Sequence, residues 1–132
     1  MGTWGVGTFE NDAASDWVYD LEKVNDVTIL KSTIAAITES DAYLEARACE
    51  NALAAAEVIA ALGGQPAADL PESVTTWIKL NAGLRADELR SPSAAAIDRT
   101  LADSELKQLW DETDDAESWA ACVRDLRARL NS

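Results

Sequence analysis

Three aspartates occur at every fourth position near the beginning of the chain, at Asp12, Asp16 and Asp20. On a helix this spacing places the three carboxylates on one stripe. Like charges placed in this way destabilise a helix by roughly 0.2–0.5 kcal/mol per pair. The helix dipole offsets the charge of Asp12, reaches Asp16 only marginally and does not reach Asp20. The stripe is therefore either an ordinary solvated edge of an amphipathic helix or a surface for a cationic partner or a divalent ion.

Side chains next to this stripe extend the candidate site. Glu10 adds a carboxylate, Asn11 an amide and Trp4 a large aromatic ring. Asn11 or Asp12 is also expected to cap the first helix, because a short polar side chain accepts from the free N–H groups of a first turn. We assign no catalytic residue, and the candidate binding residues are Trp4, Glu10, Asn11, Asp12, Asp16 and Asp20.

The chain contains no histidine, which removes the commonest general base and transition-metal ligand. Zinc sites and Ser-His or Cys-His catalysis within one chain are thereby excluded. The two cysteines, Cys49 and Cys122, lie in helical patterns and are expected to be buried, reduced thiols. Glu50 and Glu57 stand seven residues apart and could share a helix face, which we expect to be solvated. The sequence thus predicts neither a metal nor a cofactor.

Acidic residues outnumber basic ones by 24 to 11, which gives a net charge of −13. Nucleic acids and anionic membrane surfaces attract proteins mainly through Lys and Arg, so both are disfavoured as partners. A basic protein or a cation is the electrostatically favoured ligand, unless the charge serves solubility alone. The sequence shows no signal-peptide pattern and no apolar run near the ~20 residues of a membrane span. We therefore expect a cytoplasmic protein.

The first seventeen residues combine glycine with large aromatic side chains. Glycine occupies positions 2, 5 and 7, and Trp4, Phe9 and Trp17 stand among and after these glycines. Glycine allows close approach of backbone, and each of these aromatic residues can bury roughly 150–250 Å². We expect a glycine-jointed arm that folds back onto the domain and pins the first helix. A phosphate-binding loop is disfavoured, because the lysine of such loops is missing.

A length of 132 residues fits a single domain, residues 1–132, that can bury a core without disulfides. Apolar residues recur at helical spacing along the chain, which predicts an all-α bundle of six or seven helices. The longest helix is expected from Ser40-Asp41 to Gly63-Gly64. Its alanine-rich surface is apolar around most of its girth, which is typical of a central helix. A break is expected at Asp103-Ser104, and Thr113-Asp114 should begin the last helix.

The segment Val27–Ser40 allows two interpretations. Its many β-branched residues favour a strand. Its apolar residues at positions 27, 30, 34 and 37, however, fit a helical period better than strict alternation. We predict a helix here, and a partly extended conformation stays open.

The opening Gly2-Thr-Trp-Gly-Val-Gly-Thr-Phe-Glu-Asn-Asp12 resembles the N-terminal signature of a bacterial group known as domain-of-unknown-function family 4259. Members of that group begin Met-Gly-x-Trp-Gly-x-Gly-x-Phe, followed by an acidic residue, Asn-Asp and an amphipathic helix. A looser match lies in residues 103–112 and in Trp119, Leu126 and Leu130. The resemblance implies a small bacterial, cytoplasmic domain, and it carries no catalytic residues to this chain.

These observations favour a non-catalytic acidic domain that binds another protein. One concrete form is an immunity-like or antitoxin-like inhibitor that covers a basic partner such as a nuclease. The alternative is a carboxylate-based enzyme or a divalent-cation-binding domain built on Glu10, Asp12 and Asp16. Acids around an aromatic-walled pocket would favour the alternative, and a flat or convex acidic face would favour the binder. The sequence leaves the oligomeric state open.

Overall fold

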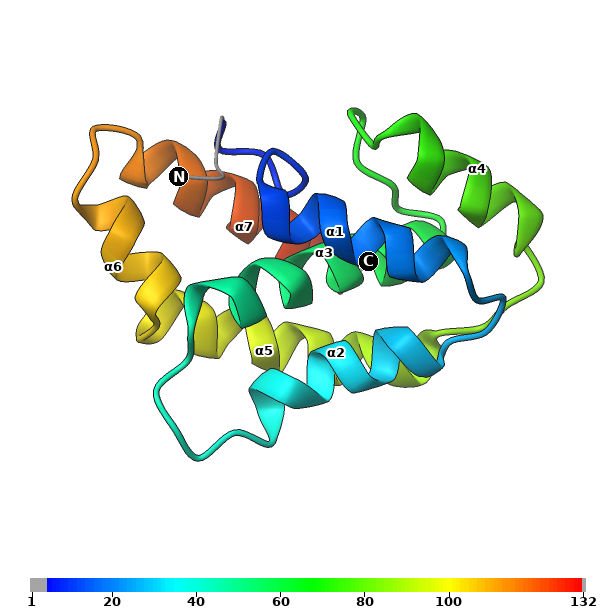
Figure 1. Cartoon of the computed structure of the whole chain (residues 1–132), viewed down its shortest axis with the longest axis horizontal. Coiled ribbons are helices and arrows are strands. Elements are labelled where there is room, and N and C mark those ends of the chain that lie inside the picture. Colours follow the sequence, from blue (N-terminus) through cyan, green and yellow to red (C-terminus); the bar gives the residue numbers. More distant parts are fainter. Residues whose placement is uncertain (1–4, 132) are drawn as a thin grey trace.

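The computed structural model describes residues 5–131, so the candidate residue Trp4 lies outside the described part. Within it the chain forms only helices and connecting segments, which confirms the all-α prediction (Figure 1). The seven α-helices and the single 3₁₀ turn of residues 5–131 are α1 (Asp12–Glu22), α2 (Thr28–Thr38), α3 (Ala46–Leu62), α4 (Glu72–Leu80), η1 (Asp87–Leu89), α5 (Arg90–Ala102), α6 (Glu105–Asp111) and α7 (Ala116–Leu130).

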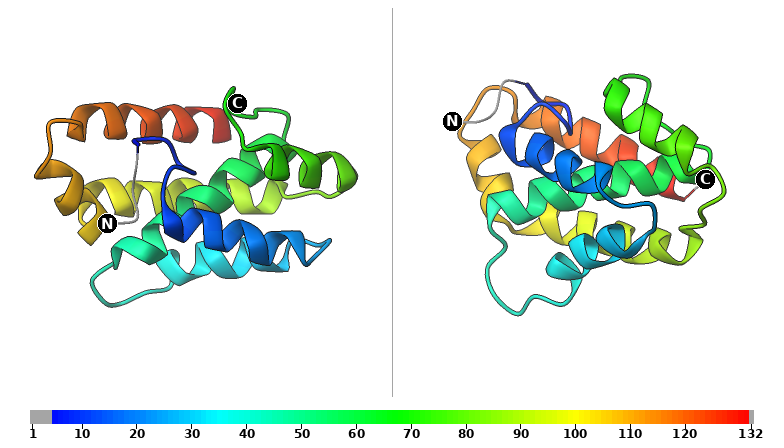
Figure 2. Two further views of the ribbon diagram at one scale, coloured as in Figure 1. Left: turned by 45° about the horizontal axis from the view of Figure 1, so that its top comes forward. Right: turned by 45° about the vertical axis from the view of Figure 1, so that its right-hand side comes forward.

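The helix α3 is the centre of the bundle, as its alanine-rich sequence predicts. Every residue from Ala52 to Ala61 is buried, and α3 contacts each of the other six α-helices. Alanine side chains allow close approach of neighbouring helices and lose no rotamer entropy on burial. Figure 2 shows the other helices arranged around α3, with the N-terminal arm on the same side of the molecule as α1 and α7.

The segment Val27–Ser40, for which both a helix and a partly extended conformation were open, forms the helix α2 over Thr28–Thr38. Leu30, Ile34 and Ile37 are buried in the contacts of α2 with α3 and α5. The Thr33 hydroxyl donates to the Ile29 carbonyl and accepts a hydrogen bond of 2.9 Å from Trp17 Nε1. A β-branched residue thereby holds α2 against α1, and tertiary contacts outweigh the modest helix propensity of the segment.

The helix α3 begins at Ala46, so the predicted beginning at Ser40-Asp41 is wrong. Glu105, at the beginning of α6, forms two hydrogen bonds with the segment at the beginning of α3. Its backbone N–H donates to the Leu44 carbonyl at 2.9 Å, and its Oε1 accepts from the Ala46 N–H at 2.7 Å. Glu105 therefore supplies the cap of α3 from 59 residues away in the sequence, and residues 41–45 stay outside the helix.

A second long-range contact holds the segment that connects α2 to α3. Arg99 of α5 donates from Nη1 to the carbonyl of Ile37 and, at 3.0 Å, to the carbonyl of Ser40. A guanidinium at the C-terminal end of α2 satisfies carbonyl groups that lack partners within the helix and interacts favourably with the helix dipole. This contact ends α2 and turns the chain toward α3.

The predicted break at Asp103-Ser104 is confirmed. The Ser104 hydroxyl caps α6 by accepting from the Lys107 N–H at 3.0 Å. The last helix begins at Ala116 and not at Thr113-Asp114, because the Thr113 hydroxyl donates to the Trp110 carbonyl at the end of α6. Thr113 thus closes one helix before the next one begins.

Candidate functional site

The glycine arm is folded around the carboxylate of Glu10. The Gly7 N–H donates to Glu10 Oε1 at 3.0 Å, and the Glu10 N–H donates to the Gly7 carbonyl at 3.0 Å. A Cβ at Gly5 would lie 2.4 Å from Glu10 Oε2, and one at Gly7 would lie 2.5 Å from Oε1. A side chain at either position would displace the carboxylate from the loop. The two glycines are therefore explained by the close approach of Glu10.

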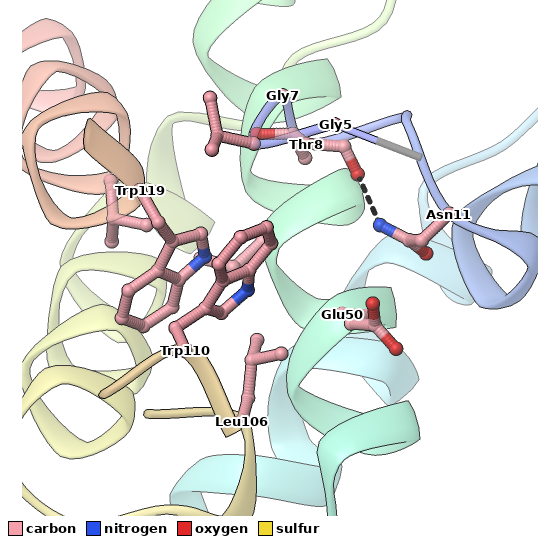
Figure 3. Close-up of a pocket in the computed structure, with 11 residues that line it drawn as sticks. Gly5, Gly7, Thr8, Asn11, Glu50, Leu106, Trp110 and Trp119 are labelled. Carbon is pink, nitrogen blue, oxygen red and sulfur yellow. Dashed lines mark hydrogen bonds between the residues drawn. The ribbon is translucent and has the colours of Figure 1, made fainter. Parts of the chain in front are cut away.

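Asn11 joins this loop to α1, as the capping prediction requires. Its extended backbone leads into the helix, and its Oδ1 accepts from the Ala14 N–H at 2.8 Å. Its Nδ2 donates to the Thr8 carbonyl at 3.1 Å (Figure 3). Glu10 and Asn11, both candidate binding residues, are thus engaged in holding the arm and the first turn of α1.

Thr8 connects the arm to an ion pair in the protein interior. The Thr8 hydroxyl donates to Glu57 Oε2 at 3.2 Å, and Glu57 on α3 is only 4% exposed. Arg129 on α7 binds both oxygens of Glu57, from Nη1 at 2.9 Å and from Nη2 at 3.1 Å. The expectation of a solvated face is therefore wrong for Glu57. One signal in the sequence was its position inside an otherwise apolar run, between Ala56 and Val58.

Glu50 faces a small space beneath the arm. The indoles of Trp110 and Trp119 are stacked, with centroids 6.3 Å apart, on one side of this space, and Glu50 and Asn11 lie on the other (Figure 3). Burial raises the pKa of Glu50 above its ordinary value; Arg47 acts in the opposite direction and Asp12 in the same one. The space measures about 10 Å³, enough for about one water molecule but not for a substrate.

The aspartate stripe lies exposed on α1, but its members have different neighbours. Asp16 Oδ2 accepts from Arg47 Nη2 on α3 at 3.1 Å, and Asp20 lies 3.8 Å from the Lys23 ammonium. Both pairs are more than half exposed, so each contributes about 0–1 kcal/mol. No group of three or more acidic or cysteine side chains within residues 5–131 is arranged to hold a metal ion.

Among residues 5–131, many more carboxylates than basic side chains take part in no ion pair. Ion pairs among residues 5–131 engage six of the 11 basic side chains but only seven of the 24 acidic ones. Two further arginines, Arg90 and Arg99, donate to backbone carbonyls. Most of the positive charge is thus committed within the fold, whereas most of the negative charge faces solvent.

The two thiols differ in exposure: the prediction of two buried cysteines is confirmed for Cys49 and wrong for Cys122, which is only partly buried. Neither forms a disulfide. Burial raises the pKa of Cys122, and the nearby carboxylates of Asp69 and Asp125 raise it further. The nucleophilic thiolate is therefore disfavoured at neutral pH.

The arm and the helices that it joins define a small all-α domain with an acidic surface. The chain belongs to the family described as Domain of unknown function (DUF4259), whose profile matches residues 2–121. The resemblance inferred from the N-terminal signature is thereby confirmed. No curated protein and no solved structure matches the chain. Within residues 5–131, each helix is too short or too polar to cross a bilayer.

Proposed function

We propose that this protein is a non-catalytic binding domain for a basic protein in the bacterial cytoplasm. The observation that supports this proposal is the charge imbalance, in which seven of 24 carboxylates but six of 11 basic side chains take part in the ion pairs among residues 5–131. Complementary charge accelerates association and excludes partners of the same sign. In its most specific form, the domain is an immunity-like or antitoxin-like inhibitor that covers the basic surface of a partner such as a nuclease.

The helix α1 is well suited to present the stripe Asp12, Asp16 and Asp20 without rearrangement. Asn11 caps its beginning, and the Val24 carbonyl just beyond its end accepts from Trp77 Nε1 at 2.8 Å. A surface held at both ends loses little conformational entropy on binding. The three aspartates are exposed, so a partner can reach them directly.

The geometry gives less support to the alternative, a carboxylate enzyme or a divalent-cation site. Glu10 is bound to the arm through Gly7, and Asp16 is bound to Arg47, so these carboxylates do not converge on one point. The aromatic-walled space beside Glu50 holds about 10 Å³. A catalytic carboxylate must lie within hydrogen-bond reach of a bound substrate, and this space leaves no room for one.

The proposal is tested by affinity capture from a bacterial lysate, with the wild-type chain and with the triple variant Asp12→Asn, Asp16→Asn, Asp20→Asn. A control variant removes three exposed charges elsewhere, Glu112→Gln, Asp114→Asn and Asp115→Asn. We expect a basic protein to be retained at low salt by the wild type and the control, and to be lost from the stripe variant. Equal retention by both variants would exclude the stripe as the site, and capture of no basic protein would overturn the function.

A further inference from the structure

A groove lies between α1 and α4, which contact each other. It consists of two adjoining hollows of about 300 and 450 Å³ that share Glu22 and Ser73. The two hollows therefore adjoin at Glu22 and Ser73 and are together called the groove. The further lining residues that carry the argument are Val18, Tyr19, Glu72, Thr76, Trp77 and Leu80.

Two apolar side chains at the groove are unusually exposed. Leu80 on α4 is 78% exposed and Tyr19 on α1 is 67% exposed. These are the two most exposed of the large hydrophobic residues in the described part of the chain, ahead of Tyr43 and Leu109. Exposed apolar side chains that gather beside a hollow and are rimmed by polar groups mark interaction surfaces.

The floor of the groove is rigid. Trp77 is 4% exposed, and its indole N–H is bound to the Val24 carbonyl just beyond α1. Val18 of α1 and Val74 of α4 are both buried in the same core. The groove is therefore preformed, and a ligand need not order it on binding.

The groove carries negative charge, which favours a positively charged ligand. Glu22 and Glu72 line it, are exposed and take part in none of the ion pairs of residues 5–131. Of the nearby cations, Lys23 is paired with Asp20, and Lys79 does not line the groove. Two carboxylates beside an apolar channel complement a segment that carries apolar and basic side chains together.

We propose that this groove binds an amphipathic basic helix of the partner protein. Its apolar side chains would pack between Tyr19 and Leu80 over Trp77, and its Lys or Arg side chains would reach Glu22 and Glu72. The nine residues of α4 extend over about 14 Å, which matches anchors at positions i, i+3 or i+4, and i+7 of such a helix. This inference rests on the proposed function, and it names the part of the partner that the domain holds.

The test uses a defined probe, a synthetic peptide of about 18 residues whose leucines and lysines follow a helical period of 3.6. A second peptide has the same composition but alternates the two residues, so that as a helix it has no apolar stripe. Calorimetric titration at low and high salt compares the wild type with the double variant Tyr19→Ala, Leu80→Ala. The matched control is Tyr43→Ala, Leu109→Ala, which truncates the same residue types at exposed positions outside the groove.

We expect the amphipathic peptide to bind the wild type and the control, with affinity reduced about tenfold or more in the groove variant. Glu22→Gln with Glu72→Gln should lower the affinity and its salt dependence, whereas Glu88→Gln with Glu112→Gln should have a smaller effect. All the substituted side chains are exposed, and a thermal melt of each variant shows that the fold is intact.

Five results would overturn the groove proposal. Equal affinity for the two peptides, or equal loss in the groove and control variants, would show attraction by charge alone. Absence of peptide binding would exclude this ligand class. If the wild-type chain forms a dimer and Leu80→Ala abolishes it, a second copy occupies the groove. If the groove variant still retains a captured basic protein, the groove proposal is refuted but the proposed function stands. Failure to capture any basic protein overturns the proposed function itself.

Discussion

Glu57 of α3 and Arg129 of α7 form a two-pronged ion pair in the protein interior, 72 residues apart in sequence. The pair is shielded from solvent, because the Glu57 side chain is 6% and the Arg129 side chain 16% exposed. Thr8 of the arm and the backbone carbonyl of Gln65 add further hydrogen bonds to it. Three distant parts of the chain are thereby held together by one pair of charges.

Removing one member of this pair should strongly destabilise the fold. Arg129→Met leaves the Glu57 carboxylate buried without its cation, which should lower the free energy of unfolding by about 3–5 kcal/mol. The double variant Glu57→Gln, Arg129→Met should lose less than the single variants combined, because neither partner is then left charged. Urea denaturation measures each value. Arg124→Met, which breaks the exposed pair with Glu117, is the control and should cost about 1 kcal/mol or less.

The loop around Glu10 gives a second prediction, on the role of the glycines. Gly7→Ala should displace the Glu10 carboxylate, and Glu10→Ala should remove it, so each should destabilise the arm by about 1–2 kcal/mol. Because both changes break the same contact, the double variant should be little less stable than either single one. Thermal melts and amide exchange of residues 5–10 provide the measurements. Full additivity would show that the glycines and Glu10 act independently.

The pH dependence of stability tests the environment of Glu50. Burial raises its pKa in the folded protein above the unfolded value, so its contribution favours folding below the unfolded pKa and is lost as the pH rises through the folded pKa. Glu50→Gln should therefore stabilise the protein at neutral pH and have almost no effect at acid pH, where the carboxyl group is neutral. Glu88→Gln removes the same charge at an exposed site. If both substitutions stabilise equally at neutral pH, the effect is one of net charge and not of burial.

The two thiols should react at very different rates with a thiol reagent. Cys122 is only partly buried and should be labelled in the native state, whereas buried Cys49 should react only on unfolding. Because the pKa of Cys122 is raised, its labelling at neutral pH should be slower than that of a free cysteine and should accelerate in more alkaline buffer. Mass spectrometry after timed labelling distinguishes the two sites. Native labelling of Cys122→Ser at a comparable rate would contradict this assignment.

The elements of the fold could be predicted wherever the determining contacts are local. The apolar pattern of Ala52–Ala61 predicts a central helix, and the short polar side chains of Asn11 and Asp12 predict that one of these two residues caps α1, as Asn11 does. The beginning of α3 could not be predicted in this way. It depends on Glu105, whose side chain reaches Ala46 from another helix, and a local pattern contains no information on that contact.

In the candidate site, too, features set by local sequence could be predicted and features set by helix packing could not. The spacing of the aspartates placed them correctly on one exposed stripe of α1, but the partnership of Asp16 with Arg47 depends on how α1 and α3 pack. The groove was not predicted at all. It depends on the packing of α4 against α1, which leaves the large hydrophobic residues Tyr19 and Leu80 exposed.

The aspartate stripe gives the last prediction, in which stability and binding should change independently. Asp16→Asn removes an exposed pair with Arg47 worth about 0–1 kcal/mol. The same change relieves repulsion from Asp12 and Asp20 of roughly 0.2–0.5 kcal/mol per pair. The two effects nearly cancel, so the melting temperature should change little. Asp20→Asn should behave alike, because its pair with Lys23 is equally exposed and longer, at 3.8 Å.

Partner binding, in contrast, should weaken in both variants if the stripe is a recognition surface. Charges at the rim of an interface act mainly on association, so slower association and a weaker salt dependence are expected. The measurement is a binding titration of each variant against the captured partner at two salt concentrations, beside a thermal melt. Glu112→Gln serves as the control, because it removes one exposed charge far along the chain from α1. Unchanged affinity in both aspartate variants would show that the stripe is only a solvated edge of α1, and unfolding of Asp16→Asn would show instead that the Arg47 contact is essential to the fold.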